Sequence, residues 1–215
     1  MSSLEFFRLI GDVIIYAAPI IALIYFISFI RNNRAYKIFT IYLFLIAMIQ
    51  WGSYYVGRGG LNANNLYYSH YYFISQFILL SFFYFELLKS LLIKIVLVGV
   101  LLFVSYQFID DPTIYLRYNP LGMAITHAIL VVYAMIYLYK SLQGKKEFII
   151  VNMGLLIYLI SSTLIFASGN LVLDLDFSIE TKRILINVNR FLALLFQILV
   201  LIEWFKNYRP NSRTK

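Results

Sequence analysis

The sequence predicts an all-α membrane protein, a bundle of seven transmembrane helices with the N-terminus outside and the C-terminus in the cytoplasm. The composition is the first reason. It is 62% hydrophobic and 13% charged, whereas soluble domains contain about 45–50% apolar and about 25% charged residues. The second reason is a series of apolar segments, each near the ~20 residues with which a helix crosses ~30 Å of hydrocarbon. The third is that successive loops alternate in charge. We expect a single domain over residues 1–215.

We expect the seven spans at residues 13–30, 38–56, 66–88, 91–109, 121–139, 148–168 and 184–205. The segments are apolar throughout, whereas the strands of a membrane barrel alternate over about 10 residues. Helices also satisfy the backbone polar groups within each segment, as hydrocarbon requires. The order suggests a 3+1+3 pseudo-repeat with span four as a linker. FELLK at 85–89 and IEWFK at 202–206 close the third and seventh spans in a similar way.

A few residues distinguish the spans from plain apolar helices. In chain order they are Pro19 in the first, Gln50 in the second, His70 and Gln76 in the third, Gln107 in the fourth, Thr126 and His127 in the fifth, Asn152 and Gly154 in the sixth, and Asn187, Arg190 and Gln197 in the seventh. Polar groups in hydrocarbon are costly and face the bundle interior or water. Pro19 predicts a kink. Asn152 and Gly154 predict close helix packing.

The loop charges predict the orientation. One alternate set of loops is basic and contains Arg31, Arg34, Lys37, Lys89, Lys94, Lys140, Lys145, Lys146, Lys206, Arg209, Arg213 and Lys215. The other set is acidic or mixed and contains Glu5, Arg8, Asp12, Arg58, Asp110, Asp111, Arg117, Asp174, Asp176, Glu180, Lys182 and Arg183. Basic loops stay in the cytoplasm. The net charge of +8 is therefore explained by topology and anionic lipid, and no nucleic-acid partner is expected.

The seventh span carries the sharpest candidate for a binding site. Asn187, Arg190 and Gln197 share one helical face, because they are spaced at i, i+3 and i+10. A buried arginine needs a partner or water. Arg190 can hold an anionic or polar ligand through its planar guanidinium. Alternatively, it snorkels outward or pairs with Asp12 or with a loop acid such as Glu180.

Other polar residues of the outer half predict a vestibule around Arg190. The topology places Gln76, His70 and His127 there, from spans three and five. His70 is either part of this vestibule or a polar tip among the tyrosines at the membrane surface. A metal site needs more ligands than two histidines from different spans, and the chain has no cysteine. We expect no metal and no cofactor.

Catalytic and cofactor motifs are missing from the sequence. It contains no HExxH, GxSxG, phosphate-binding or dinucleotide motif, so we do not expect an enzyme. The size and orientation resemble microbial rhodopsins, but the seventh span has no lysine for retinal before Lys206 at its inner end. The 3+1+3 order resembles small sugar and vitamin-precursor transporters. The Pro-Gln dipeptide typical of the sugar group is missing.

Three functions fit these observations. The first is a non-enzymatic, receptor-like module that binds a small polar or anionic ligand or a partner helix in the outer vestibule. It would need a separate protein partner for signalling output. The second is a small-solute transporter, and the third is an assembly subunit of a membrane complex. The lipid bilayer is the expected surrounding, and the charge pattern fits the plasma membrane of a prokaryote.

Overall fold

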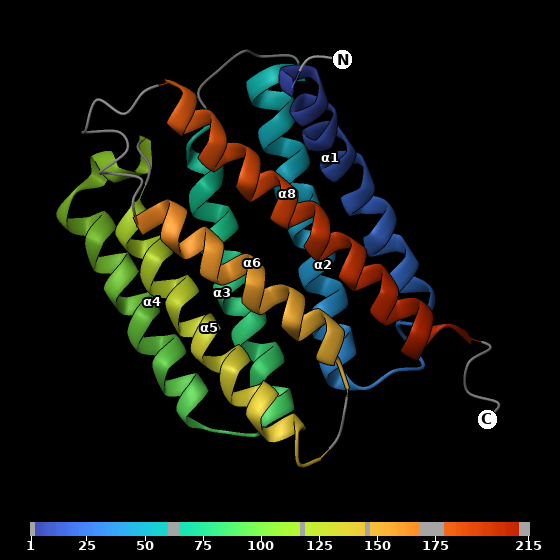
Figure 1. Cartoon of the computed structure of the whole chain (residues 1–215). Helices are drawn as coiled ribbons and strands as arrows, with labels where there is room; N and C mark the ends of the chain where they lie inside the picture. The colour runs from blue at the N-terminus through green and yellow to red at the C-terminus, as the bar shows by residue number, and fades with distance from the viewer. Residues whose placement is uncertain (1–2, 60–64, 117–118, 145–146, 168–178, 211–215) are drawn as a thin grey trace.

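A computed structural model describes residues 3–59, 65–116, 119–144, 147–167 and 179–210. These residues form long helices and no strand (Figure 1). The helices are α1 (Ser3–Ile27), α2 (Arg34–Tyr54), α3 (Tyr67–Leu88), α4 (Leu92–Asp110), α5 (Pro120–Ser141), α6 (Ile149–Ala167) and α8 (Ile179–Glu203). Short helical turns follow α2, α4 and α8 at Tyr55–Gly59, Pro112–Leu116 and Trp204–Tyr208. Most of the predicted loop 169–183 lies outside the described residues, as do Lys145 and Lys146.

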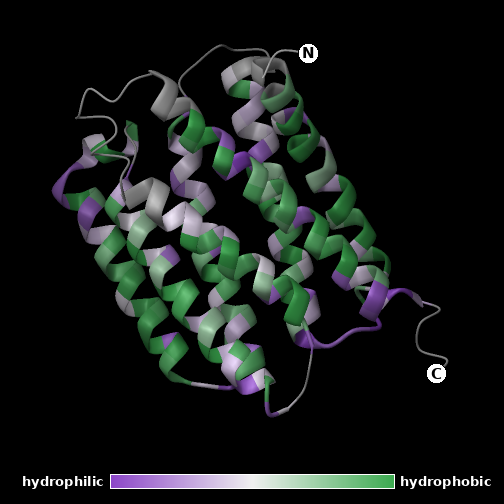
Figure 2. Ribbon diagram, viewed as in Figure 1, coloured by the Kyte–Doolittle hydropathy of each residue, from purple (hydrophilic) through white to green (hydrophobic). Residues whose placement is uncertain are grey.

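The apolar helices confirm a multi-pass α-helical membrane protein. Within the described residues, six helices are long and apolar enough to cross a membrane, and α6 contributes a shorter apolar stretch, Ile149–Thr163. Figure 2 shows hydrophobic residues along the middles of the helices and hydrophilic ones towards their ends. The predicted and observed bounds agree within two residues for α3, α4, α5 and α6. Three helices begin earlier than predicted: α1 at Ser3 and not near residue 13, α2 at Arg34 and not near 38, and α8 at Ile179 and not near 184. A helix can continue beyond the hydrocarbon because its hydrogen bonds are internal.

Six of the helices form a closed ring. Around it, α1 packs on α2, α2 on α3, α3 on α5, α5 on α6, α6 on α8, and α8 returns to α1. Helix α4 lies outside this ring against α3 (Figure 1). The N-terminus and the C-terminus lie at opposite ends of the bundle. We call these the N-terminal end and the C-terminal end.

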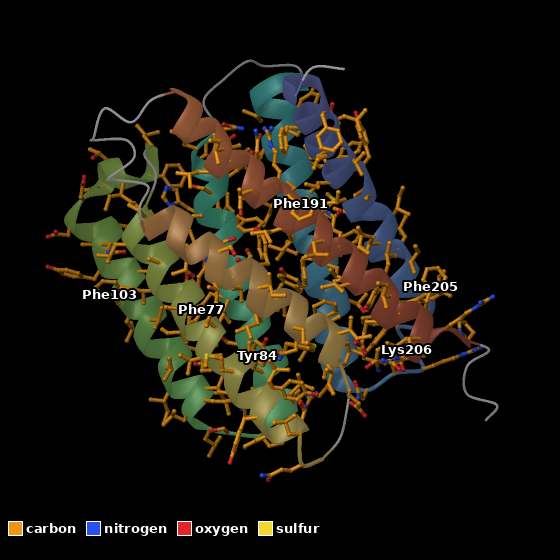
Figure 3. All side chains as sticks on the ribbon, viewed as in Figure 1. Phe77, Tyr84, Phe103, Phe191, Phe205 and Lys206 are labelled. Carbon is orange, nitrogen blue, oxygen red and sulfur yellow. The ribbon has the colours of Figure 1, made fainter. Side chains whose placement is uncertain are left out.

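Aromatic side chains fill the C-terminal half of the ring. We call Tyr25, Tyr36, Phe39, Phe83, Phe148 and Tyr208 the aromatic plug. Ring centroids are 4.7 Å apart for Tyr36–Tyr208, 5.0 Å for Phe148–Tyr208 and 5.2 Å for Phe83–Phe148. All six are buried, and five of them are fully enclosed. Figure 3 shows Phe77 and Tyr84 of α3 inside the bundle, whereas Phe103 and Phe205 are partly exposed on its outside.

The start of α6 is held by a carboxylate from another helix. Glu203 of α8 is completely buried, and its Oε2 accepts hydrogen bonds from the backbone N–H groups of Ile150 at 3.0 Å and Val151 at 3.4 Å. A negative charge is favoured at a helix N-terminus. Phe148, just before α6, has a left-handed backbone with φ 56° and fits its ring into the plug. Surrounding contacts must hold such a conformation in place.

The similar segments FELLK and IEWFK make different contacts in the fold. Glu86 of FELLK forms an ion pair with Lys89 and a second one with Arg34 at 3.8 Å. Glu203 of IEWFK instead caps α6. The helices α1–α3 and the set α5, α6 and α8 take equivalent places around the ring. Duplication of the chain stays a prediction.

Candidate functional site

A cavity of about 540 Å³ lies inside the ring at the N-terminal end of the bundle. We call it the vestibule. Every helix of the ring contributes to its walls, and α4 does not. Its polar side chains are Gln50, Ser53, Asn65, Ser69, Asn189 and Arg190. Tyr54, Tyr68, Tyr72 and Tyr158 add aromatic rings with hydroxyl groups. The vestibule therefore combines a cation, hydrogen-bonding groups and flat apolar surfaces.

A narrower space of about 50 Å³ continues from the vestibule towards the middle of the bundle. We call it the deep cavity. The two spaces share Ile14, Gln50, Tyr72, Tyr158 and Ala193. Apolar side chains make up most of the remaining wall, among them Ile21, Leu43, Ile46, Phe196 and Val200.

The deep cavity ends at the aromatic plug. Tyr42, which lines it, packs on Phe39 with ring centroids 5.6 Å apart. The Tyr25 hydroxyl donates a hydrogen bond to the backbone carbonyl of Val200, another lining residue, at 2.8 Å. Below, the Tyr36 hydroxyl donates to the carbonyl of Tyr25 at 2.7 Å. The aromatic plug therefore lies between the deep cavity and the C-terminal end of the bundle.

Arg190 lies in the wall of the vestibule. Its Nη1 donates a hydrogen bond to the backbone carbonyl of Phe7 in α1 at 3.4 Å. A Cβ on Gly11 would lie 3.6 Å from Arg190 Nε, so the guanidinium rests against the backbone of α1. The side chain of Glu180 is outside the described part of the chain, and pairing with Glu180 or Asp12 stays a prediction.

Gln197 and Gln50 line the deep cavity, and their side-chain amide oxygens are buried. Gln197 Nε2 donates to the backbone carbonyl of Ile14 at 2.9 Å. This bond requires the amide nitrogen on that side, so the oxygen points the other way. Both Gln197 Oε1 and Gln50 Oε1 are buried and lack a hydrogen-bond partner. Most buried polar atoms in proteins have one.

Gln76 and His127 meet behind the wall and not in either cavity. Gln76 Nε2 donates to the Tyr42 hydroxyl at 3.1 Å, and its Oε1 lies 2.9 Å from His127 Nε2. Both side chains are fully buried. The chain of hydrogen bonds joins α2, α3 and α5, and Tyr42 brings one end of it to the deep cavity.

His70 is buried between α3, α4 and the turn after α4. Its ring lies 5.2 Å from that of Phe108 and is stacked on Tyr115 at 6.1 Å. A hydrogen bond with Tyr71 raises the pKa of the Tyr115 hydroxyl. His70 is not in the described lining of either cavity. In the described part of the chain, no three His, Cys, Asp or Glu side chains are grouped to hold a metal.

Asn189, and not Asn187, lines the vestibule from α8. Asn189 Oδ1 accepts a hydrogen bond from Ser162 of α6 at 3.1 Å. Reasoning from the sequence missed Asn189 as a site residue, whereas it included Gln50 among the polar residues of the spans. Helical spacing pointed to Asn187 instead, because it shares one face of the helix with Arg190 and Gln197. Asn189 lies about 100° around the helix from Arg190, where α6 approaches.

Comparisons of the chain with protein-family models, with curated proteins and with solved structures give no match.

Proposed function

We propose that this chain is a seven-span, receptor-like membrane protein without enzymatic activity. It binds a small polar or anionic ligand in the vestibule. The observation that carries the proposal is a cavity that holds Arg190, reaches one end of the bundle and is closed at the other by the aromatic plug. Binding sites for small molecules commonly have volumes of about 300–1,000 Å³.

The vestibule opens to the outside in this proposal. The described basic residues near the C-terminal end include Arg31, Arg34, Lys89, Lys140 and Lys206, and basic segments stay in the cytoplasm. Helix α6 supplies the seventh span. Its 19 residues rise ~28 Å, which is close to the thickness of the hydrocarbon. The ligand would arrive from outside the cell, and a protein partner would receive the signal on the cytoplasmic side.

An anionic ligand is favoured by the charges of the site. Arg190 is positively charged, and none of the described residues that line the vestibule or the deep cavity is acidic. A guanidinium binds a carboxylate or a phosphate through two parallel hydrogen bonds. The hydrogen bond from Nη1 to the Phe7 carbonyl holds the guanidinium at the wall of the vestibule.

A small-solute transporter with a 3+1+3 repeat is the second candidate. The equivalent places of α1–α3 and of α5, α6 and α8 in the ring favour it. Transport requires a second conformation in which the aromatic plug opens. The buried cap from Glu203 and the hydrogen bond from Tyr25 to Val200 oppose that opening. These contacts favour the receptor over the transporter.

Binding to the purified protein in lipid nanodiscs tests the proposal. The probes are small carboxylates, small phosphates and neutral compounds of matched size. We expect saturable binding of at least one anion, lost in Arg190→Gln and retained in Arg31→Gln, which removes an arginine at the opposite end. An Arg190→Gln variant that is less stable, in a protein that binds none of the probes, would instead support an assembly subunit. Uptake of a bound anion into proteoliposomes would support the transporter.

A further inference from the structure

We infer that the C-terminal end of the bundle holds a second binding site, which takes a small zwitterion with an anionic group and a primary ammonium group. The anionic group, a carboxylate or a phosphate, binds beside Lys140 and Arg34, and the ammonium group binds beside Glu147. This site is separate from the vestibule, so the inference goes beyond the proposed function and does not rest on it.

The site is a cavity of about 490 Å³, which we call the C-terminal pocket. Its walls come from the start of α2, the ends of α3 and α5, and the segment before α6. Figure 1 shows these four parts of the chain at the end of the bundle away from the vestibule. The volume is within the range of about 300–1,000 Å³ for small-molecule sites. The polar lining residues are Asn33, Arg34, Glu86, Lys89, Tyr137, Lys140, Ser141 and Glu147.

The basic side chains of the C-terminal pocket outnumber the carboxylate that pairs with them. Glu86 forms ion pairs with Lys89 and, at 3.8 Å, with Arg34. The side chain of Glu86 is only 10% exposed, whereas those of Arg34 and Lys89 are 83% and 68% exposed, so a ligand can reach both cations. Lys140 is a third, exposed cation and forms no ion pair with a described residue. This part of the pocket is therefore positively charged and attracts an anionic group.

Glu147 provides a negative charge in another part of the same pocket. Its Oε2 accepts a hydrogen bond from Asn33 Nδ2 at 2.9 Å, and its backbone carbonyl accepts one from the hydroxyl group of Tyr137. Contacts with α2 and α5 thus position both its side chain and its backbone. Glu147 is exposed and has no ion pair with a described residue, so its carboxylate is accessible to an ammonium group.

Lys140 and Glu147 line one pocket with opposite charges, yet they do not pair with each other. A simple anion would meet Glu147 as a like charge, and a simple cation would meet three basic side chains. A zwitterion instead places each of its charges beside a group of opposite charge. Since charged groups lose hydration when they enter a pocket, both ends of the ligand need such a partner. The mixed lining therefore favours a zwitterion over an ion of either sign.

The C-terminal pocket lies directly beside the aromatic plug. Ala35 and Glu147 line the pocket, and each directly precedes a member of the plug, Tyr36 and Phe148. A ligand in the pocket would join α2, α3, α5 and the segment before α6 on the C-terminal side of the plug. Because it binds the folded protein with this arrangement, it should raise the temperature of thermal unfolding.

Hydration of the same charges is the competing explanation. Exposed charges at helix ends are commonly solvated, and pairs between them contribute little. If water alone occupies the C-terminal pocket, zwitterions will bind no more tightly than simple ions. The two explanations therefore differ in whether a ligand gains affinity by carrying both charges.

Calorimetry on the protein in phosphatidylglycerol nanodiscs separates these explanations. β-Alanine and 4-aminobutyrate carry both charges at two different spacings. Propionate and butyrate carry only the carboxylate, and propylamine carries only the ammonium group. We expect saturable binding of at least one zwitterion, at least about threefold tighter than that of the matched carboxylate, because one partly exposed ion pair has roughly that effect.

Two variants assign the binding to the C-terminal pocket. Glu147→Gln should remove the preference for the zwitterion over the matched carboxylate, and Lys140→Gln should weaken zwitterion binding by at least about threefold. The matched controls are Asp110→Asn and Lys206→Gln, which change exposed residues outside the described lining of the pocket. Thermal unfolding without ligand shows whether each variant is folded. Arg190→Gln should retain the binding, because Arg190 lies in the vestibule.

The source of the zwitterion is tested with nanodiscs that also contain phosphatidylethanolamine. The headgroup of this lipid carries a phosphate and a primary ammonium group. Weaker binding of the soluble zwitterion in these nanodiscs would identify the lipid headgroup as a ligand of the pocket. Equal binding in both kinds of nanodisc would identify a water-soluble ligand.

Three results would overturn the inference. The first is equal affinity for the zwitterion and its matched carboxylate in the unmodified protein. The second is a zwitterion preference that survives in Glu147→Gln, or binding that is lost in Arg190→Gln and retained in Lys140→Gln. The third is the absence of saturable binding by either zwitterion. None of them rejects the proposed function, whose test is the binding of anions at Arg190.

Discussion

The polar residues of the spans make different contacts inside this bundle, although all of them occur in similar apolar segments of the sequence. Arg190 and Gln197 reach the cavity walls, whereas Gln76 and His127 bond to each other behind them. Helical spacing predicted the first pair, because both lie on one face of one helix. The pairing of Gln76 with His127 depends on how α3 packs on α5, and spacing within one helix carries no information about that contact.

Glu203 is another residue whose contacts could not be predicted from spacing within one helix. In the sequence, its place in IEWFK resembles that of Glu86 in FELLK, which pairs with Lys89. In the fold it is completely buried and bonds to backbone N–H groups of Ile150 and Val151. The approach of α6 to α8 decides this role, and only the three-dimensional arrangement reveals it.

Glu203→Ala should destabilise the protein by about 1–3 kcal/mol, because two backbone donors at the start of α6 would lose their acceptor. Glu203→Gln should cost less, since its amide oxygen can still accept. Thermal unfolding of the protein in detergent measures both. Glu147→Ala is the control, because that side chain is exposed and bonds to Asn33. Equal losses for Glu203→Ala and Glu147→Ala would contradict the proposed role of the cap.

The helices themselves were largely predictable, since long apolar runs identify spans. Their order around the ring was not. It depends on contacts between segments far apart in sequence, such as α1 with α8. The place of α4 outside the ring is a related case. Like most of the ring helices, α4 is long and apolar enough to cross a membrane, so hydropathy does not distinguish a ring helix from a peripheral one. A vestibule in the outer half could be expected from the sequence. Which residues line it depends on how the helices pack around the ring.

Helices α6 and α8 meet closely at Gly154. A Cβ added there would lie 3.0 Å from Leu199 Cδ1 and 3.1 Å from Phe196 Cδ2. The sequence predicted a packing role for this glycine, and the geometry supports it. Gly99 of α4 offers a contrast, because a Cβ added there would have no neighbour within 4 Å.

Gly154→Val should therefore destabilise the protein by about 1–3 kcal/mol through overpacking, whereas Gly99→Val should change its stability little. Both substitutions place the same side chain in a membrane helix, so the change in helix propensity is matched. Unfolding in a denaturing detergent, followed by circular dichroism, measures the difference. Similar effects at both sites would show that α6 and α8 do not pack as described.

The molecule as a whole is asymmetric along its axis. One end holds the vestibule with Arg190, and the other holds the aromatic plug and many basic residues. Both the direction of ligand entry and the need for a cytoplasmic partner depend on which end faces outward. The charges predict this orientation, and the fold itself is equally compatible with the opposite one.

Cysteine labelling in intact cells decides the orientation, and the chain has no cysteine of its own. Ser69→Cys places a thiol in the vestibule, and Gln143→Cys places one at the C-terminal end. With a membrane-impermeant thiol reagent, we expect Ser69→Cys to react in intact cells and Gln143→Cys to react only after permeabilisation. The reverse pattern, or reaction of both positions from outside, would contradict a ligand site that opens to the exterior.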